Sequence, residues 1–389
     1  MIKRIIFLTE DNFNMRDHQR FGVEILRENR FNVEIWDTTT ALHPDLHRAS
    51  YDSDKTGDKG LISFRNAAEL RKKLAALKNG DFVVNLINYR LKTLSIYRAL
   101  SRSNAEYAVL MTNNLPAPAA VKPASQRTRV KEIFSLSRKE IMVKIFDKTP
   151  FGLFGVKAAK LILAGGEVLA PSRYPVARGT EILRAHAMDY DIYMKEKDMP
   201  FSGDGNIAVY LDEYLPFHPD WKYYGMEFPM NADVYYGLLD KLFSKIEKEL
   251  KMEVVIAAHP RSNYKEGDDY FKGRRCARDR SCALVRESRL VISHASTSIT
   301  FAVLFHKPLL FVTARQIDKC WEGPLIRSIA QWFEKEPIFM DDDATLDWQR
   351  EMRVNREHYD NYRRNYIKRD SSPELPFWQI VADRLKDPR

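Results

Sequence analysis

His259 is the first residue whose type and position suggest chemistry. It follows a run of apolar, mostly β-branched residues at 254–258 and precedes Pro260. Such a run is typical of a parallel strand buried on both faces, and proline cannot continue the hydrogen-bond ladder of that strand. We therefore expect His259 at the carboxyl end of a strand, where open α/β sheets bind ligands. It could hold a phosphate and help a nucleotide leave, with Arg261 adding positive charge, or it could be satisfied by backbone groups alone.

A second segment combines hydroxyl groups with the expected start of a helix. Residues 290–293 predict a strand that leads into Ser296, Thr297 and Ser298, and an apolar helix should follow. Free N–H groups, hydroxyls and the helix dipole favour a phosphate at such a position. Serine and threonine are also ordinary helix caps, so the alternative is a purely structural role. We expect the neighbouring His294 to be packed or hydrogen-bonded.

Two adjacent acids, Asp212 and Glu213, follow the predicted strand at residues 207–211. Neighbouring strand residues face opposite ways, so we expect only one carboxylate to enter a ligand site. A carboxylate there could deprotonate an acceptor hydroxyl or attack an anomeric carbon. The alternative is a pair of acids that fixes the chain locally. Taken with His259 and the hydroxyl-rich segment, the acids favour a nucleotide-sugar site.

The composition limits the possible partners. The chain has 389 residues, 44% of them hydrophobic and 30% charged, with a formal net charge of +9. This is an ordinary folding composition, and the length favours two domains. The positive charge suggests an anionic partner such as a charged sugar donor or a membrane surface. We find no nucleic-acid motif and expect no nucleic-acid partner.

Cysteine and acid spacing argue against a metal. The three cysteines have no metal-binding spacing, and their odd number favours a reducing cytoplasm. No Asp-x-Asp motif is found, and the acidic run at residues 341–343 is typical of a turn. No long apolar run or signal peptide is evident, so we expect a cytoplasmic protein that can contact the inner membrane peripherally. We expect no metal and no cofactor.

The elements that must position these residues alternate along the chain. In the first half, strands are predicted at residues 5–8, 33–36, 82–87, 107–111 and 167–170. Helices are predicted at residues 16–28, 66–77, 136–146 and 156–163. The alternation indicates a doubly wound parallel sheet, although no G-x-G-x-x-G motif follows the first strand.

The second half repeats this organisation. A polar, proline-containing segment at residues 198–205 suggests a domain boundary near residue 200. We therefore predict a domain at residues 1–200 on the acceptor side and another at 201–389 on the donor side. Further strands are expected at residues 309–312 and 338–340, a long helix at 231–250, and a helical tail that can cross back. Polar loops at residues 10–18, 112–114 and 185–191 should face the cleft.

With these residues in place, the chain resembles bacterial glycosyltransferases of the GT-B fold that use CMP-activated acidic sugars, the Kdo-transferase-like and sialyltransferase-like enzymes. The resemblance rests on an acidic pair, a His-Pro motif and a Ser-Thr motif, matched here by Asp212-Glu213, His259-Pro260 and Ser296-Thr297. The sequence departs from the sialyltransferase pattern at Tyr214, where many members have glycine. That departure favours the Kdo-transferase branch.

The resemblance implies two Rossmann-like domains facing each other across a cleft. His259 and Ser296-Thr297 would bind the CMP phosphate, and Asp212 would be the catalytic carboxylate, with Glu213 as its substitute. The expected reaction moves Kdo or a related nonulosonic acid from a CMP-sugar to a surface-glycan acceptor. The alternatives are a GT-B enzyme that uses a UDP-sugar or CDP-polyol donor, and a non-catalytic basic binding module.

Overall fold

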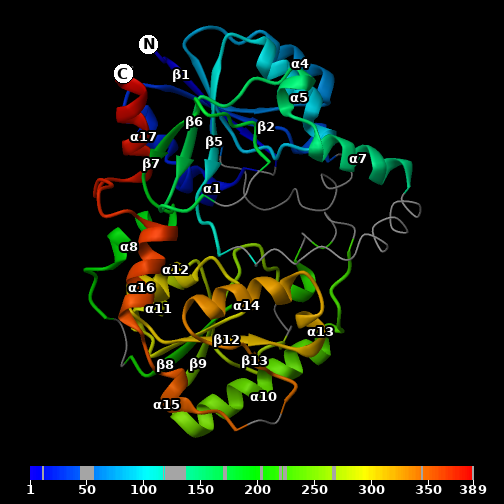
Figure 1. Cartoon of the computed structure of the whole chain (residues 1–389). Coiled ribbons are helices and arrows are strands. Elements are labelled where there is room, and N and C mark those ends of the chain that lie inside the picture. The colour runs from blue at the N-terminus through cyan, green and yellow to red at the C-terminus, as the bar shows by residue number, and fades with distance from the viewer. Residues whose placement is uncertain are drawn as a thin grey trace.

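The chain forms two α/β domains, one above the other in Figure 1. The structure is a computed structural model. It describes residues 1–10, 13–43, 57–116, 118, 137–169, 173–201, 205–218, 221, 226–264, 269–342 and 345–387.

A seven-stranded parallel sheet forms the first domain, in the order β3-β2-β1-β4-β5-β6-β7. Its strands are β1 (Arg4–Thr9), β2 (Asn32–Asp37), β3 (Leu61–Ser63), β4 (Asp81–Asn85), β5 (Glu106–Met111), β6 (Leu161–Ala164) and β7 (Glu181–Arg184). Its helices are α1 (Met15–Arg20), α2 (Val23–Glu28), α3 (Thr39–Leu42), α4 (Ala67–Ala75), α5 (Leu94–Arg102) and α7 (Arg138–Lys148), with short helices η1 (Leu91–Thr93) and η2 (Phe151–Phe154).

A six-stranded parallel sheet forms the second domain, in the order β10-β9-β8-β11-β12-β13. Its strands are β8 (Ile207–Leu211), β9 (Glu253–Ala258), β10 (Cys276–Arg278), β11 (Leu290–Ser293), β12 (Leu309–Thr313) and β13 (Ile338–Phe339). Its helices include η3 (Leu215–Phe217), α10 (Ala232–Leu250), α11 (Ser281–Glu287), α12 (Ile299–Leu304), α13 (Arg315–Asp318) and α14 (Glu322–Trp332). The C-terminal segment adds α15 (Trp348–Glu351), α16 (Arg356–Tyr362), the π-helix η4 (Arg363–Ile367) and α17 (Phe377–Lys386).

Both sheets have the doubly wound order, which confirms the predicted fold class. In each, the chain winds outward from a central strand, returns, and winds outward in the other direction. The reversal falls between β1 and β4 in the first domain and between β8 and β11 in the second. Ligands of such sheets bind outside the carboxyl ends of the strands at this switch point.

Two sequence predictions in the first domain were wrong. The segment predicted as a helix at residues 156–163 contains strand β6, which pairs with β5 and β7. A short, fully buried apolar run has no periodicity that separates a strand from a helix, and here the neighbouring strands decide. The strand predicted at 167–170 is absent from its described residues, 167–169.

The single helix predicted at residues 16–28 is two helices, α1 and α2. Gly22 lies between them with φ of +52°, a left-handed conformation that favours glycine. A Cβ atom at Gly22 would stand 2.6 Å from the indole of Trp378, so the glycine also makes room for the C-terminal helix α17. The break therefore has both a backbone and a packing cause.

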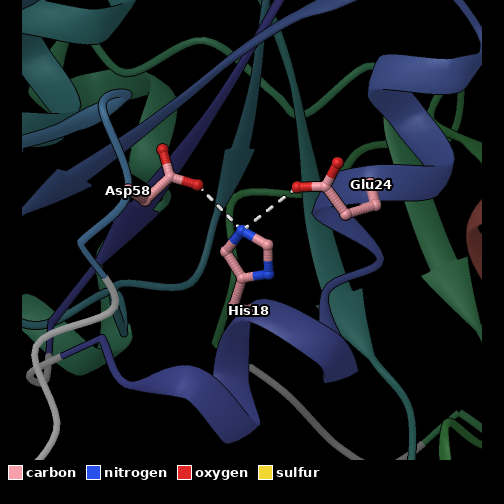
Figure 2. A group of neighbouring side chains, drawn as sticks. All are labelled: His18, Glu24 and Asp58. Atoms are coloured by element: carbon pink, nitrogen blue, oxygen red, sulfur yellow. Dashed lines mark hydrogen bonds and ion pairs between the residues drawn. The ribbon is translucent and has the colours of Figure 1, made fainter.

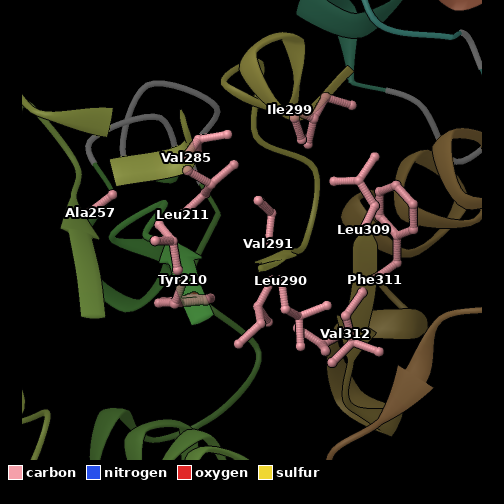
Figure 3. Packing of buried hydrophobic residues seen from close by; sticks show 14 of the residues in the cluster. Tyr210, Leu211, Ala257, Val285, Leu290, Val291, Ile299, Leu309, Phe311 and Val312 are labelled. Atoms are coloured by element: carbon pink, nitrogen blue, oxygen red, sulfur yellow. The ribbon is translucent and has the colours of Figure 1, made fainter. Parts of the chain in front are cut away.

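The core of the second domain is built from continuous apolar strands (Figure 3). Val291 of β11 and Leu309 of β12 are completely buried, and so is Tyr210 of β8, on the other side of β11 from Leu309. Residues of strands covered on both faces have no solvent-facing side to alternate with, which is why these strands appear in the sequence as unbroken apolar runs. This core holds the carboxyl ends of β8, β9 and β11 in fixed positions.

The C-terminal segment returns to the first domain (Figure 1). After η4, helix α17 packs on the first domain, where the Trp378 indole donates a hydrogen bond to the Arg20 carbonyl (2.9 Å). Backbone bonds from Glu167 and Val168 to Arg364 and Asn365 join the two parts on the way. The C-terminal segment therefore links the domains.

Helix α8 (Asp189–Glu196) precedes the predicted boundary near residue 200 but packs against the second domain. The rings of Tyr193 and Phe305 lie 5.0 Å apart, and Arg286 donates hydrogen bonds to the carbonyls of Met199 and Pro200. The last strand of the first sheet ends at Arg184, before this helix, and the first strand of the second sheet begins at Ile207, after it. Among the described residues, no helix is both long and apolar enough to span a bilayer.

Candidate functional site

The structure brings the three sequence motifs of the second domain to one edge of its sheet. Strand β8 is the central strand, with β9 and β11 as its two neighbours. Asp212 follows β8, His259 follows β9, and the segment at residues 294–298 follows β11. All three motifs therefore lie at carboxyl ends of adjacent parallel strands, around the switch point of the domain.

The carboxylate of Asp212 binds groups of the protein itself. One oxygen accepts hydrogen bonds from the His259 N–H (3.0 Å) and the Tyr264 hydroxyl (2.9 Å), and the other accepts one from the Tyr214 N–H (2.9 Å). The residue is only 4% exposed. Burial raises the pKa of Asp212, and these bonds oppose that effect only in part. The geometry fits a residue that ties the end of β8 to the loop after β9, and its catalytic role stays a prediction.

Glu213 makes the corresponding connection on the other side of β8. Its Oε1 accepts hydrogen bonds from the backbone N–H groups of His294 (3.2 Å) and Ala295 (2.8 Å). Burial of the carboxyl group, together with the nearby Glu322, raises its pKa well above the ordinary value. Two backbone N–H groups at the end of β11 therefore donate to Glu213 and cannot bind an anionic ligand at the same time. The residue as a whole is partly exposed.

His259 presents a defined hydrogen-bond donor to the site. Its Nδ1 accepts a bond from the Arg261 N–H (3.2 Å), so the proton of the neutral ring is on Nε2. Burial, with smaller contributions from His218 and Arg261, lowers the pKa of His259 to about 3. The ring is therefore neutral at pH 7, and it can donate from Nε2 to a phosphate oxygen without carrying a charge of its own.

Charged residues of the first domain lie opposite His259. Arg16 of α1 is close enough to His259 and Asp279 for its charge to act on them, and Asp17 is similarly close to Arg261. A hydrogen bond from the Ser328 hydroxyl to the Pro116 carbonyl (3.2 Å) also crosses between the domains. The candidate site therefore has one wall from each domain, and sequence reasoning had not connected Arg16 or His218 with His259.

The hydroxyl-rich segment uses most of its own N–H groups. The N–H of Ser296 bonds to Ser293 Oγ (3.3 Å), and that of Ser298 bonds to Ser296 Oγ (3.2 Å). Thr297 is exposed, while the helix that follows, α12, has only six residues. Phosphate binding by Ser296, Thr297 and Ser298 stays a prediction, and it would rely on hydroxyls more than on the helix dipole.

His294 is structural, as expected. The Tyr210 hydroxyl lies 2.7 Å from that of Tyr235, which lies 3.0 Å from His294 Nε2, and His294 Nδ1 lies 2.7 Å from the Val312 carbonyl. Since a carbonyl only accepts, His294 Nδ1 donates to Val312, Tyr235 donates to His294 Nε2, and Tyr210 donates to Tyr235. Burial lowers the pKa of His294 to about 4, so this buried chain is uncharged at neutral pH.

Of the loops predicted to face the cleft, two have structural roles where they are described. Asn113 accepts a hydrogen bond from the Met188 N–H (2.9 Å), and both ring nitrogens of the buried His186 lie 2.9 Å from carbonyls, of Ala187 and Leu375. Residues 11 and 12 of the first loop lie outside the described residues. Glu10 of that loop belongs to a separate cluster in the first domain.

One group of side chains has the composition of a metal site (Figure 2). His18 Nε2 lies 2.8 Å from an oxygen of Asp58 and 3.5 Å from one of Glu24. Arg27, however, binds both carboxylates, at 2.7 and 2.9 Å. Burial alone would raise the pKa of Asp58, but bonds from Arg27, the Gly60 N–H and His18 lower it to about 2. We assign this cluster as an ion-pair network that joins α1 and α2 to residues 57–60.

Comparisons with known proteins give a fold and no family. No family model matches the chain, and no curated protein matches its sequence. The wall teichoic acid polymerase TagF is structurally similar over 100% of this chain and 90% of its own, with a TM-score of 0.52 and 12% identity. The glycotransferase of kitacinnamycin matches over 98% of this chain and 97% of its own, with a TM-score of 0.50 and 10% identity.

A UDP-GlcNAc 2-epimerase from Neisseria meningitidis, bound to UDP-GlcNAc, covers 100% of both chains with a TM-score of 0.42 and 12% identity. At these identities, similarity establishes architecture. The chain has the GT-B architecture of two doubly wound domains that face each other.

Proposed function

We propose that this chain is a transferase whose donor is a nucleoside diphosphate compound, either a UDP-sugar or a CDP-polyol. The nucleotide phosphates would lie at the carboxyl ends of β9 and β11, facing α1. The observation that carries the proposal is the half-buried His259 at the carboxyl end of β9, whose Nδ1 accepts a hydrogen bond from the Arg261 N–H and whose Nε2 is thereby left as a donor. The GT-B fold, shared with a teichoic acid polymerase and a glycotransferase, supports this reaction class.

His259 would act on the leaving group. When the bond between the transferred group and the phosphate oxygen breaks, the electron pair stays on that oxygen. A hydrogen bond from His259 Nε2 would stabilise the new charge, and Arg16 and Arg261 would supply the positive field. Ser296, Thr297 and Ser298 would add hydroxyl donors, and Pro260 ends the strand so that the histidine faces the ligand.

Within this proposal, Asp212 and Glu213 are positioning residues. Both carboxylates bind backbone N–H groups of the loops that carry His259 and Ser296. The CMP-linked acidic sugar predicted from the sequence needs an accessible catalytic carboxylate, and the burial of Asp212 weakens that version. Support is therefore stronger for the UDP-sugar or CDP-polyol donor.

A thermal-stability panel of CMP, CDP, UMP, UDP and GDP tests the donor. A ligand at about a hundred times its dissociation constant stabilises the folded state by about 2.7 kcal/mol, which raises the melting temperature measurably. We expect a shift with UDP or CDP in the wild type and its loss in His259→Gln. His306→Gln, a partly exposed histidine of the same domain, is the matched control and should keep the shift.

Two other results would change the assignment. A shift with CMP but with neither diphosphate would contradict the UDP-sugar donor and leave the two donors that release CMP, a CDP-polyol and a CMP-linked acidic sugar. No shift with any nucleotide would contradict the proposal and favour a binding module without a nucleotide donor.

A further inference from the structure

The switch point of the first domain holds a cluster of side chains that the donor site does not use. Glu10 follows β1, His43 follows α3, and Arg90 follows β4. His43 Nε2 lies 3.0 Å from Glu10 Oε1, Arg90 pairs with the same oxygen, and the Asn88 N–H donates to Glu10 Oε2 (3.2 Å). The three residues therefore converge at the place where a doubly wound sheet binds its ligand.

The pairing determines which nitrogen of His43 is the base. A carboxylate only accepts, so Nε2 of the neutral ring carries the proton that Glu10 holds, and Nδ1 keeps a lone pair. That lone pair accepts a long hydrogen bond (3.4 Å) from Nζ of the exposed Lys92, so a bound acceptor hydroxyl would have to replace the ammonium at Nδ1. Burial alone would raise the pKa of Glu10, but the bonds to His43 and Arg90 outweigh it and lower it. Glu10 is thus an anion that orients the ring.

One polar atom of the cluster points to a missing ligand. Arg90 Nε is buried, and no described residue offers it a hydrogen-bond acceptor. Buried polar groups without partners are rare in folded proteins, so a bound molecule is a natural source of its partner. With the Lys92 ammonium nearby, that molecule would carry oxygen atoms and a negative charge.

We propose that this cluster is the acceptor site, in which His43, oriented by Glu10, is the general base for an acceptor that carries a hydroxyl and an anionic group. The proposal rests on the proposed transferase function. The acceptor proton passes to His43 Nδ1, and the acceptor oxygen bonds to the transferred group. That group's bond to the donor phosphate then breaks, with its electron pair left on the phosphate oxygen. Lys92 and Arg90 would hold the anionic group of the acceptor.

Binding of a sugar phosphate tests the site without any donor. Glucose 6-phosphate and glucose would be titrated into the full chain by calorimetry. We expect glucose 6-phosphate to bind at least tenfold more tightly than glucose, and Lys92→Ala to remove that preference. Lys241→Ala, in the second domain, is the control and should change nothing. Equal binding of the two sugars, or no binding of either, would overturn the proposal.

Transfer separates the base from the donor site. With UDP-glucose as donor and glucose 6-phosphate as acceptor, nucleotide release by His43→Gln should fall at least 100-fold, the usual size of a general-base effect. The UDP-induced melting shift should remain. In Glu10→Gln, the rate of nucleotide release should fall by a smaller factor, and kcat should decrease more than KM increases. An unchanged rate of nucleotide release in His43→Gln would overturn the assignment of His43 as the base. The absence of a UDP-induced melting shift in the wild type would instead contradict the donor proposal.

A second surface rests on a different observation, an exposed apolar helix with a net positive charge. On α7, Ile141 is 40% exposed, Met142 56% and Ile145 58%, and the adjoining Leu153 is 77% exposed. Among the side chains of this helix that the structure describes, Phe146 alone is buried, and it contacts Tyr89 and Phe154. Figure 1 shows α7 at the edge of the first domain, pointing away from its sheet.

Charge identifies the occupant of this surface. Helix α7 itself contains four Lys and Arg against two Asp and Glu, a net charge of +2. Apolar side chains among basic residues are the composition of helices that lie in the surface of anionic bilayers. We infer that α7 binds the headgroup layer of an anionic membrane.

Vesicle sedimentation tests this surface with the full chain. We expect binding to phosphatidylcholine vesicles that contain phosphatidylglycerol, at least tenfold weaker in high salt and in the double variant Ile141→Ser/Ile145→Ser. The matched control is Ile192→Ser/Val234→Ser, two exposed apolar residues on other helices, which should bind normally. Equal binding by both double variants would overturn the inference. So would self-association through α7, seen as dimers that Ile141→Ser/Ile145→Ser abolishes, without vesicle binding.

Discussion

The two switch points of this protein use acidic residues in opposite ways. In the second domain, Asp212 and Glu213 follow the central strand and accept hydrogen bonds from backbone N–H groups of neighbouring loops. In the first domain, Glu10 follows the central strand, and its Oε1 pairs with the side chains of His43 and Arg90, while one backbone N–H, that of Asn88, donates to Oε2. The position in the fold is the same, but the bonding partners differ.

The difference shows why an acid at a strand end does not by itself identify a catalytic group. A carboxylate held by backbone N–H groups has its lone pairs occupied by fixed donors, so it stabilises loops. A carboxylate that accepts a hydrogen bond from a histidine orients the ring and stabilises its protonated form, so the ring can take up a proton from a ligand. We therefore propose positioning roles for Asp212 and Glu213 and proton exchange for the Glu10–His43 pair.

Removing the carboxylate of Asp212 should produce the largest loss of stability. In Asp212→Ala, the N–H groups of His259 and Tyr214 and the Tyr264 hydroxyl lose their acceptor, and we expect a loss of about 3 kcal/mol. Glu10→Ala should lose less, about 1 kcal/mol, because its ion-pair partner Arg90 is 42% exposed and can be solvated in the variant. Urea unfolding of both variants measures the difference. Equal losses would break the comparison.

Asp212→Asn provides the sharper control because it keeps an oxygen acceptor without the charge. The amide NH2 would have to face the Tyr214 N–H, so this variant should lose about 1–2 kcal/mol, less than Asp212→Ala, and keep nucleotide binding. A well-folded Asp212→Asn protein that binds nucleotide but has no transferase activity would restore a catalytic role to Asp212.

Removing the Tyr235 hydroxyl from the buried series of hydrogen bonds should destabilise the protein less than Asp212→Ala does. Tyr235→Phe leaves His294 Nε2 without its donor and the Tyr210 hydroxyl without its acceptor, and we expect a loss of about 2 kcal/mol. Nucleotide binding should remain after correction for stability, because His294 faces the core. A selective loss of nucleotide affinity, measured by calorimetry in the stable fraction, would place His294 in the site.

The pH dependence of stability should separate His259 from ordinary histidines. Its folded pKa is about 3, below the unfolded value near 6.5, so the unfolded state binds the extra proton between these values. Stability contributed by the neutral ring is present above pH 6.5 and is lost as pH falls towards 3, by up to about 1.4 kcal/mol per pH unit. Urea unfolding of His259→Gln from pH 7 to 5 should show a shallower decline. An identical slope would contradict the neutral ring.

Much of the second domain could be predicted from the sequence. Continuous apolar runs identified β8, β9, β11 and β12, and Pro260 and the hydroxyl-rich segment marked their carboxyl ends. The first domain was harder to predict, because β6 has four residues and becomes a strand through pairing with β5 and β7. Local pattern fails where the deciding contacts are distant.

The same limit applies to the candidate site. The sequence placed Asp212, His259 and Ser296 at strand ends, but the direction of each carboxylate depends on partners 47 and 82 residues away. The pairing of Glu10 with His43 and Arg90 joins three loops that no motif connects. Strand-end positions can be predicted from apolar runs, whereas side-chain partners need the topology.

One pair of titrations tests the central claim most directly. UDP or CDP, whichever stabilises the wild type, and glucose 6-phosphate would each be titrated by calorimetry into the wild type, His259→Gln and His43→Gln. We expect His259→Gln to lose at least tenfold in nucleotide affinity and to bind the sugar phosphate normally, whereas His43→Gln should bind the nucleotide normally. Full nucleotide affinity in His259→Gln would contradict the assignment of the second domain's switch point as the donor site.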